Sequence, residues 1–233
     1  MHDMSSIMTD SATIGVVISL IMYGFGVWLR DKTRIDAFNP LLISIVSVIA
    51  FLELFRVDYS EFEKSGKYLS YLLTPATVAL AIPLYKQLNL LKKHFAAILI
   101  GVMSGVLTSM GSVLLLAMLF GLDHKSYVTL LPKSITTSIG MGISQQYGGC
   151  VSITAAVIII TGIVGNMIAV VWCRLLRIKS PIARGLAVGT ASHAIGTAKA
   201  MAMGEVEGAM SSLAIVVSGL LTVILASFFV MLY

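Results

Sequence analysis

The stretch LLPKSITTSIGMGISQQYGG, residues 130–149, is the part of this chain that says most about its fold. It is too polar and too rich in glycine for a lipid-facing helix, yet it lies between two long apolar runs, 95–120 and 150–176. Irregular backbone is tolerated at membrane depth only where protein covers it or a water-filled cavity adjoins it. We therefore expect 130–149 to be re-entrant, returning to the side from which it came.

The composition supports a membrane environment. Of the 233 residues, 58% are hydrophobic and 12% are charged, against roughly 45–50% and about 25% in soluble domains. A soluble protein of this size could not bury so much apolar surface. This excludes a soluble enzyme, a disordered chain and a nucleic-acid-binding module, and it predicts an integral protein of the lipid bilayer.

Apolar runs predict an all-α, polytopic membrane protein with about six spans, one of them broken by proline. A second glycine-rich re-entrant segment, 185–203, follows the first, and the polar stretch 56–67 is a connection without an apolar run. The expected spans are 13–29, 40–55, 68–84, 95–120, 150–176 and 209–233.

The interruptions suggest an internal repeat. Pro75, Ser134 and His193 are each 59 residues apart, and each precedes a long span. Transporters build midplane sites from repeated, interrupted helices, although chance spacing is the alternative. The whole chain, 1–233, is predicted to be a single membrane domain, in which a two-span segment, 1–67, precedes three such units in 68–233.

Lysine and arginine set the expected orientation. Loops 30–34, 86–93 and 174–184 carry three, three and four basic residues, whereas loop 121–125 and both termini carry one or none. The positive-inside rule then places both termini outside, provided that both glycine-rich segments are re-entrant. The mixed connection 56–67 fits this orientation least well.

The first candidate site follows Pro132. Lys133 at membrane depth is costly unless it faces water or a partner, and neighbouring hydroxyls could complete a small anion site with it. The alternative is that Lys133 extends to the interface while the hydroxyls bond to their own helix. The predicted anion-binding hydroxyls here are those of Ser134, Thr136 and Thr137.

The second candidate site is the strip 192–199. On a helix Ser192 and Gly196 share one face, and His193 and Thr197 share the adjoining one. His193 is the candidate for a proton-coupling step, because imidazole titrates near neutral pH; the alternative is a histidine that only links helices. No second ligand lies at metal-binding spacing, so neither a metal nor a cofactor is expected.

The third break combines Pro75, Thr77 and Pro83. It predicts either an unwound backbone lining the same cavity or simple helix kinking. The sequence contains no nucleophile–base pair, P-loop or dinucleotide fingerprint, so the protein is not expected to be an enzyme. Any transport would be passive or driven by an ion gradient.

Three strings resemble the LrgB/CidB family over nearly the whole chain: LTPATVALAIPLY (73–85), LPKSITT (131–137) and ASHAIGTAKA (191–200). The resemblance implies a bacterial inner-membrane protein, antiholin-like or holin-like, that modulates murein hydrolase activity and autolysis with a small LrgA/CidA partner. It also implies kinship with a plastid glycolate/glycerate translocator and with pairs linked to pyruvate uptake.

Two functional hypotheses follow. The first is a transporter or facilitator of small monocarboxylates, with substrate held by Lys133 and the surrounding hydroxyls. The second is an antiholin-like regulator of an LrgA/CidA pore with no transport of its own. A homodimer is expected by analogy with other transporters.

Overall fold

The computed structural model describes residues 13–33, 39–72, 75, 78–79 and 81–233. Its described residues form helices and no strands, which confirms the all-α membrane fold. They fall into two compact units, 1–79 and 80–233. The single membrane domain expected for the whole chain stays a prediction.

The first unit contains α2 (Ile14–Thr33), α3 (Pro40–Phe55) and α4 (Tyr59–Tyr71). Helix α3 begins where the sequence predicts, because the Asn39 side chain accepts a hydrogen bond from the Leu41 amide at 2.9 Å and Pro40 occupies the first turn. The polar connection 56–67 is largely helical. Helix α4 is anchored to α2 where the Gly15 amide donates to Ser65 Oγ at 3.1 Å.

Four helices in the described chain are long and apolar enough to cross a membrane: α2, α8 (Phe95–Phe120), α11 (Val151–Leu175) and α13 (Glu205–Val230). Helix α3 is apolar but shorter. The third expected span, 68–84, is not a continuous helix in its described part. Helix α4 ends at Tyr71, and the short helices α6 (Ala81–Lys86) and α7 (Leu88–Lys93) lead into α8.

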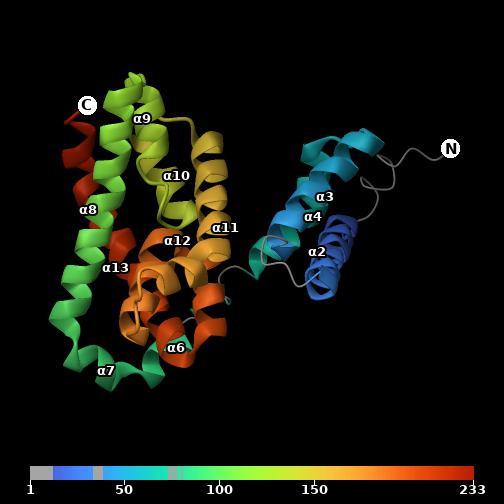
Figure 1. The fold of residues 1–233 in the computed structure, drawn as a ribbon. Coiled ribbons are helices and arrows are strands. Elements are labelled where there is room, and N and C mark those ends of the chain that lie inside the picture. The colour runs from blue at the N-terminus through green and yellow to red at the C-terminus, as the bar shows by residue number, and fades with distance from the viewer. Residues whose placement is uncertain (1–12, 34–38, 73–74, 76–77, 80) are drawn as a thin grey trace. The chain divides into compact units, whose positions relative to one another are not determined.

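The first glycine-rich segment is a helical hairpin in the second unit (Figure 1). Helix α9 (His124–Leu130) and helix α10 (Thr137–Gln146) are its arms, and residues 131–136 are its tip. The Cys150 amide donates to Thr129 Oγ1 at 2.8 Å, and Thr154 Oγ1 donates to the Thr129 carbonyl at 2.9 Å. Thr154 also contacts Ser144 on α10 at 2.7 Å. Both arms therefore meet the first turn of α11, so the segment begins and ends at the same end of that helix, and its re-entry into a membrane stays a prediction.

Asp123 starts this hairpin by capping α9. Its carboxylate accepts a hydrogen bond from the Ser126 amide at 3.4 Å. Hydrogen bonds from the Ser126 hydroxyl and amide hold the pKa of the Asp123 carboxyl below its ordinary value, because they favour the charged form. The charge also complements the positive end of the helix dipole.

The second glycine-rich segment is a hairpin as well. Helix α12 (Pro181–Met203) breaks at His193, whose φ of 41° and ψ of −140° are not helical. Before the break Gly189 packs against Ser211 of α13, and after it Thr197 Oγ1 lies 2.7 Å from Ser211 Oγ. Further on, Met201 packs against Gly208. The chain thus runs along α13 and turns back, as the sequence predicts.

The two hairpins come from opposite ends of the second unit (Figure 1). The first follows α8 and the second follows α11, which runs the other way. The first tip reaches Ser109, about 17 Å from the C-terminal end of α8 at 1.5 Å per residue. The second reaches Ile158 and Asn166 in the middle of α11. The unit is an inverted pair of spans and hairpins, whereas a third unit around Pro75 stays a prediction.

Candidate functional site

A cavity of about 1090 Å³ lies in the second unit between α8, the first hairpin tip, α11 and the first half of α12. It extends from His94 and Ser180, near the basic loops, to Lys133 at the tip. Much of its polar lining is hydroxyl groups: those of Ser104, Thr108, Ser109, Ser112, Ser134, Thr161, Ser180, Thr190 and Ser192.

Lys133 is half-buried at the inner end of this cavity, and its partners are neutral. Nζ donates to Ser134 Oγ at 3.2 Å and to Ser109 Oγ at 3.4 Å, and the two hydroxyls lie 2.9 Å apart. The described residues that line the cavity include no carboxylate. The ammonium therefore has hydrogen-bond acceptors but no counter-ion in its cavity lining.

The cluster of Lys133, Ser109 and Ser134 has more hydrogen-bond donors than the bonds among its members use. An ammonium has three donors and a hydroxyl has one. Lys133 uses two donors on the two serines, and one serine hydroxyl donates to the other. Among the described residues, one ammonium hydrogen and one hydroxyl hydrogen have no acceptor. The arrangement offers donors and positive charge in a partly desolvated place, which suits an anion.

The predicted neighbours of Lys133 are only partly brought together. Ser134 joins the cluster, and Pro132 is buried beside it in the tip. Thr136 is the residue that precedes α10, without a side-chain cap bond, and Thr137 begins that helix. Neither threonine lines the cavity.

Within the second candidate strip, 192–199, Ser192 lines the cavity. Gly196 packs against Ser192 and Val188, and Thr197 Oγ1 donates to the His193 carbonyl at 2.9 Å. The contact between Gly196 and Val188 joins the two arms, and the Thr197 bond holds the first turn after the break. Gly196 and Thr197 are therefore placed to support the tip, and neither lines the cavity.

His193 is buried, with Nε2 at 2.9 Å from the Ile158 carbonyl. A carbonyl can only accept, so Nε2 carries the hydrogen. This geometry links the second tip to α11, and Asn166 adds a bond from Nδ2 to the Ile195 carbonyl at 2.8 Å. The proton-coupling role of His193 stays a prediction.

Only part of the third break lies in the described chain. Pro75 belongs to the first unit, and Thr77 lies outside the described residues. Pro83 is in α6, which packs on α13.

The structure adds two residues that the sequence reasoning missed, Ser109 and Thr190. Both lie on helices, where hydroxyls ordinarily bond to their own backbone. The pair Gly101 and Gly105 was a sequence signal for close helix packing. Helix α12 packs against α8 there, with Leu186 and Thr190 nearest to the two glycines.

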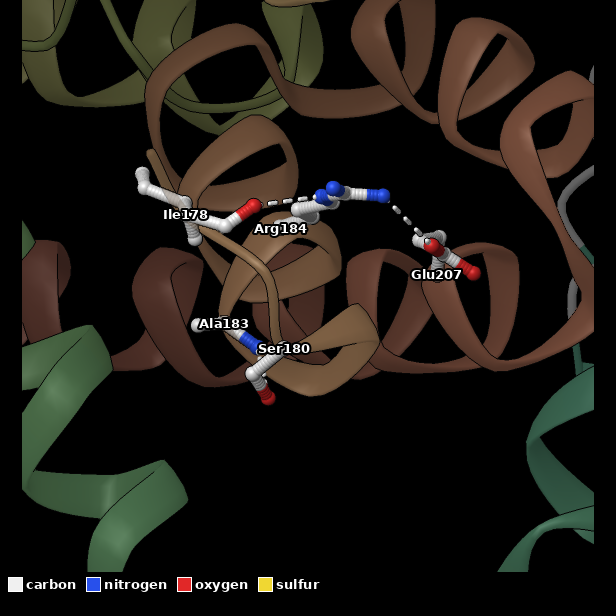
Figure 2. Close-up of polar contacts among 5 residues, drawn as sticks. All are labelled: Ile178, Ser180, Ala183, Arg184 and Glu207. Atoms are coloured by element: carbon white, nitrogen blue, oxygen red, sulfur yellow. Dashed lines mark hydrogen bonds and ion pairs between the residues drawn. The ribbon is translucent and has the colours of Figure 1, made fainter. Parts of the chain in front are cut away.

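An ion pair closes the base of the second hairpin (Figure 2). Arg184 Nε donates to the Ile178 carbonyl at 2.7 Å, and a guanidinium nitrogen lies 3.8 Å from Glu207 Oε1. Glu207 is buried at the start of α13. Since a buried carboxylate needs a partner, Arg184 ties the loop before α12 to α13.

No group of three histidine, cysteine or carboxylate side chains in the described ranges is placed to hold a metal ion.

Comparison with known proteins identifies relatives along the whole chain. The model of the LrgB-like family matches residues 19–232. Proteins named antiholin-like protein LrgB, from Bacillus mycoides (strain KBAB4) and Bacillus cereus (strain B4264), are each 39% identical over 227 residues. Each alignment covers 97% of this chain and 98% of the relative. No solved structure matches.

Proposed function

Given that this chain belongs to the LrgB-like family, we propose that it is a membrane transporter or facilitator of small monocarboxylates. The substrates are of the glycolate, glycerate, lactate or pyruvate class, and movement is driven by a gradient. The observation that carries the proposal is the Lys133 ammonium, bound to Ser109 and Ser134 in a cavity lining without a carboxylate. Paired hairpins whose tips reach the middle of long helices are the kind of architecture that transporters use.

The proposed location is the bacterial inner membrane, with both termini outside. In the second unit the C-terminal Tyr233 hydroxyl bonds to the Ala117 carbonyl at the C-terminal end of α8. The basic loops adjoin the opposite ends of α8 and α11. Under the positive-inside rule the His94 and Ser180 end of the cavity then faces the cytoplasm.

Uptake into liposomes tests the proposal. The purified full chain is reconstituted, and entry of labelled pyruvate, lactate and glycolate is measured with and without a proton gradient, beside a trapped dye that reports leakage. Lys133→Met is expected to abolish saturable uptake, because the substrate carboxylate loses its counter-charge. Lys125→Met, on the exposed part of the same hairpin, is the matched control and should transport normally. If Lys133→Met transports as well as Lys125→Met, Lys133 is not part of a substrate site.

A second candidate is an antiholin-like regulator of an LrgA/CidA pore, without transport of its own. The printed names of the relatives favour it more directly than they favour transport. Partners under this proposal are the small holin-like protein and a second copy of the chain. Autolysis rates in cells that express Lys133→Met distinguish the two: a regulator that acts through protein contacts retains its effect, and a transport-dependent effect is lost.

A further inference from the structure

The Thr190 hydroxyl is buried without a hydrogen-bond partner in the described chain. Thr190 as a whole is 7% exposed. Two other hydroxyls of the cavity are bonded within their own helix: Thr108 donates to the Ser104 carbonyl at 2.7 Å, and Ser112 donates to the Ser109 carbonyl at 2.7 Å. A buried, unsatisfied hydroxyl is rare and calls for an explanation.

Packing fixes how Thr190 stands. A Cβ placed on Gly105 of α8 would lie 2.7 Å from Thr190 Cγ2 and 4.0 Å from Oγ1. The methyl group is therefore the part that packs against α8. The hydroxyl is the more distant of the two groups from Gly105, and Thr190 as a residue lines the cavity.

Thr190 and the Lys133 cluster border the same space from different elements. Thr190 belongs to α12, whereas Ser109 is on α8 and Ser134 is in the first hairpin tip. All three line the large cavity, and all three also line an adjoining cavity of about 10 Å³. A small ligand whose carboxylate sits on Lys133 and its serines would therefore bring its next atoms toward Thr190.

We infer that Thr190 selects for an oxygen substituent next to the substrate carboxylate, as in 2-hydroxy and 2-oxo acids. This inference rests on the proposed transport function. A hydroxyl can donate to a 2-oxo oxygen and can donate to or accept from a 2-hydroxyl group. A plain alkyl acid would leave Thr190 buried and unpaired, and sites built around a substrate hydroxyl discriminate strongly against analogues that lack it.

Lactate and propionate are the probes, because they differ mainly in the 2-hydroxyl group. Uptake of each labelled acid into liposomes containing the full chain gives a ratio of kcat/KM values. The wild type is expected to prefer lactate by at least about tenfold. Thr190→Val is nearly isosteric, and it should lower this ratio by roughly tenfold while propionate uptake continues. Thr190→Ser, which keeps the hydroxyl, should retain the preference.

Thr108→Val is the matched control, since it removes a hydroxyl from the same cavity that is already bonded within its own helix. Its ratio should equal that of the wild type. An unchanged kcat/KM ratio in Thr190→Val overturns the inference and leaves Thr190 as a water site only. An equal loss of lactate and propionate uptake, with an unchanged unfolding temperature, overturns it as well. If the wild type takes up neither acid, the transport proposal fails and this inference fails with it.

Discussion

At the scale of single residues, the second hairpin tip depends on close packing against two glycines of α11. A Cβ on Gly162 would lie 2.7 Å from His193 Cε1, and a Cβ on Gly165 would overlap the Ser192 hydroxyl. His193 itself holds a left-handed φ of 41°, which costs on the order of 1–3 kcal/mol and persists only where its surroundings enforce it. Its ring bond to the Ile158 carbonyl provides such a constraint.

Gly162→Ala is therefore expected to destabilise the protein by about 1–3 kcal/mol, because the His193 ring has to move. The measurement is thermal unfolding of the detergent-purified protein. Gly111→Ala is the control: nothing lies within 4 Å of a Cβ there, and alanine should stabilise α8 by up to about 1 kcal/mol. The same shift in both variants would contradict a packing role for Gly162.

At the scale of elements, Arg184 joins the loop before α12 to the first turn of α13 (Figure 2). Glu207→Gln should lower stability by about 1–2 kcal/mol, a modest figure because the Arg184 side chain is 35% exposed and water screens the pair. Glu205→Gln removes a charge from the same helical turn, where Glu205 is exposed, so it loses the same dipole interaction without the ion pair. Unfolding temperatures of the two variants isolate the Arg184 contribution, and equal losses would mean that the pair contributes nothing.

The elements themselves were largely predictable from the sequence. The boundaries 40–55 and 95–120 agree with α3 and α8, because proline, asparagine and glycine mark helix ends locally. Both hairpins were predictable because polar, glycine-rich runs between spans are costly in lipid. Helix α4 was not, since it depends on packing against α2. The site was half predictable: Lys133, Ser134 and Ser192 line one cavity, whereas Ser109 and Thr190 join them only through contacts between separate elements.

At the scale of the whole molecule, two opposed hairpins determine which loops share a side of the membrane. The first hairpin begins and ends at the same end of the second unit, so Lys125 and Gln146 should lie on one side, and Lys179 should lie on the other. All three residues are exposed. The basic loop around Lys179 is expected inside.

Cysteine labelling checks this arrangement in a background where Cys150 and Cys173 are replaced by serine and alanine. In intact cells a membrane-impermeant maleimide should label Lys125→Cys and Gln146→Cys, and Lys179→Cys should react only after the membrane is opened. Labelling of Lys125→Cys without Gln146→Cys would mean that the first hairpin crosses the bilayer, contrary to the hydrogen bonds of both arms to the first turn of α11. A complete reversal, with only Lys179→Cys labelled in intact cells, would retain the hairpin and invert the orientation. The cavity end near His94 and Ser180 would then face outward, and the transport proposal would have to describe export through the same Lys133 cluster.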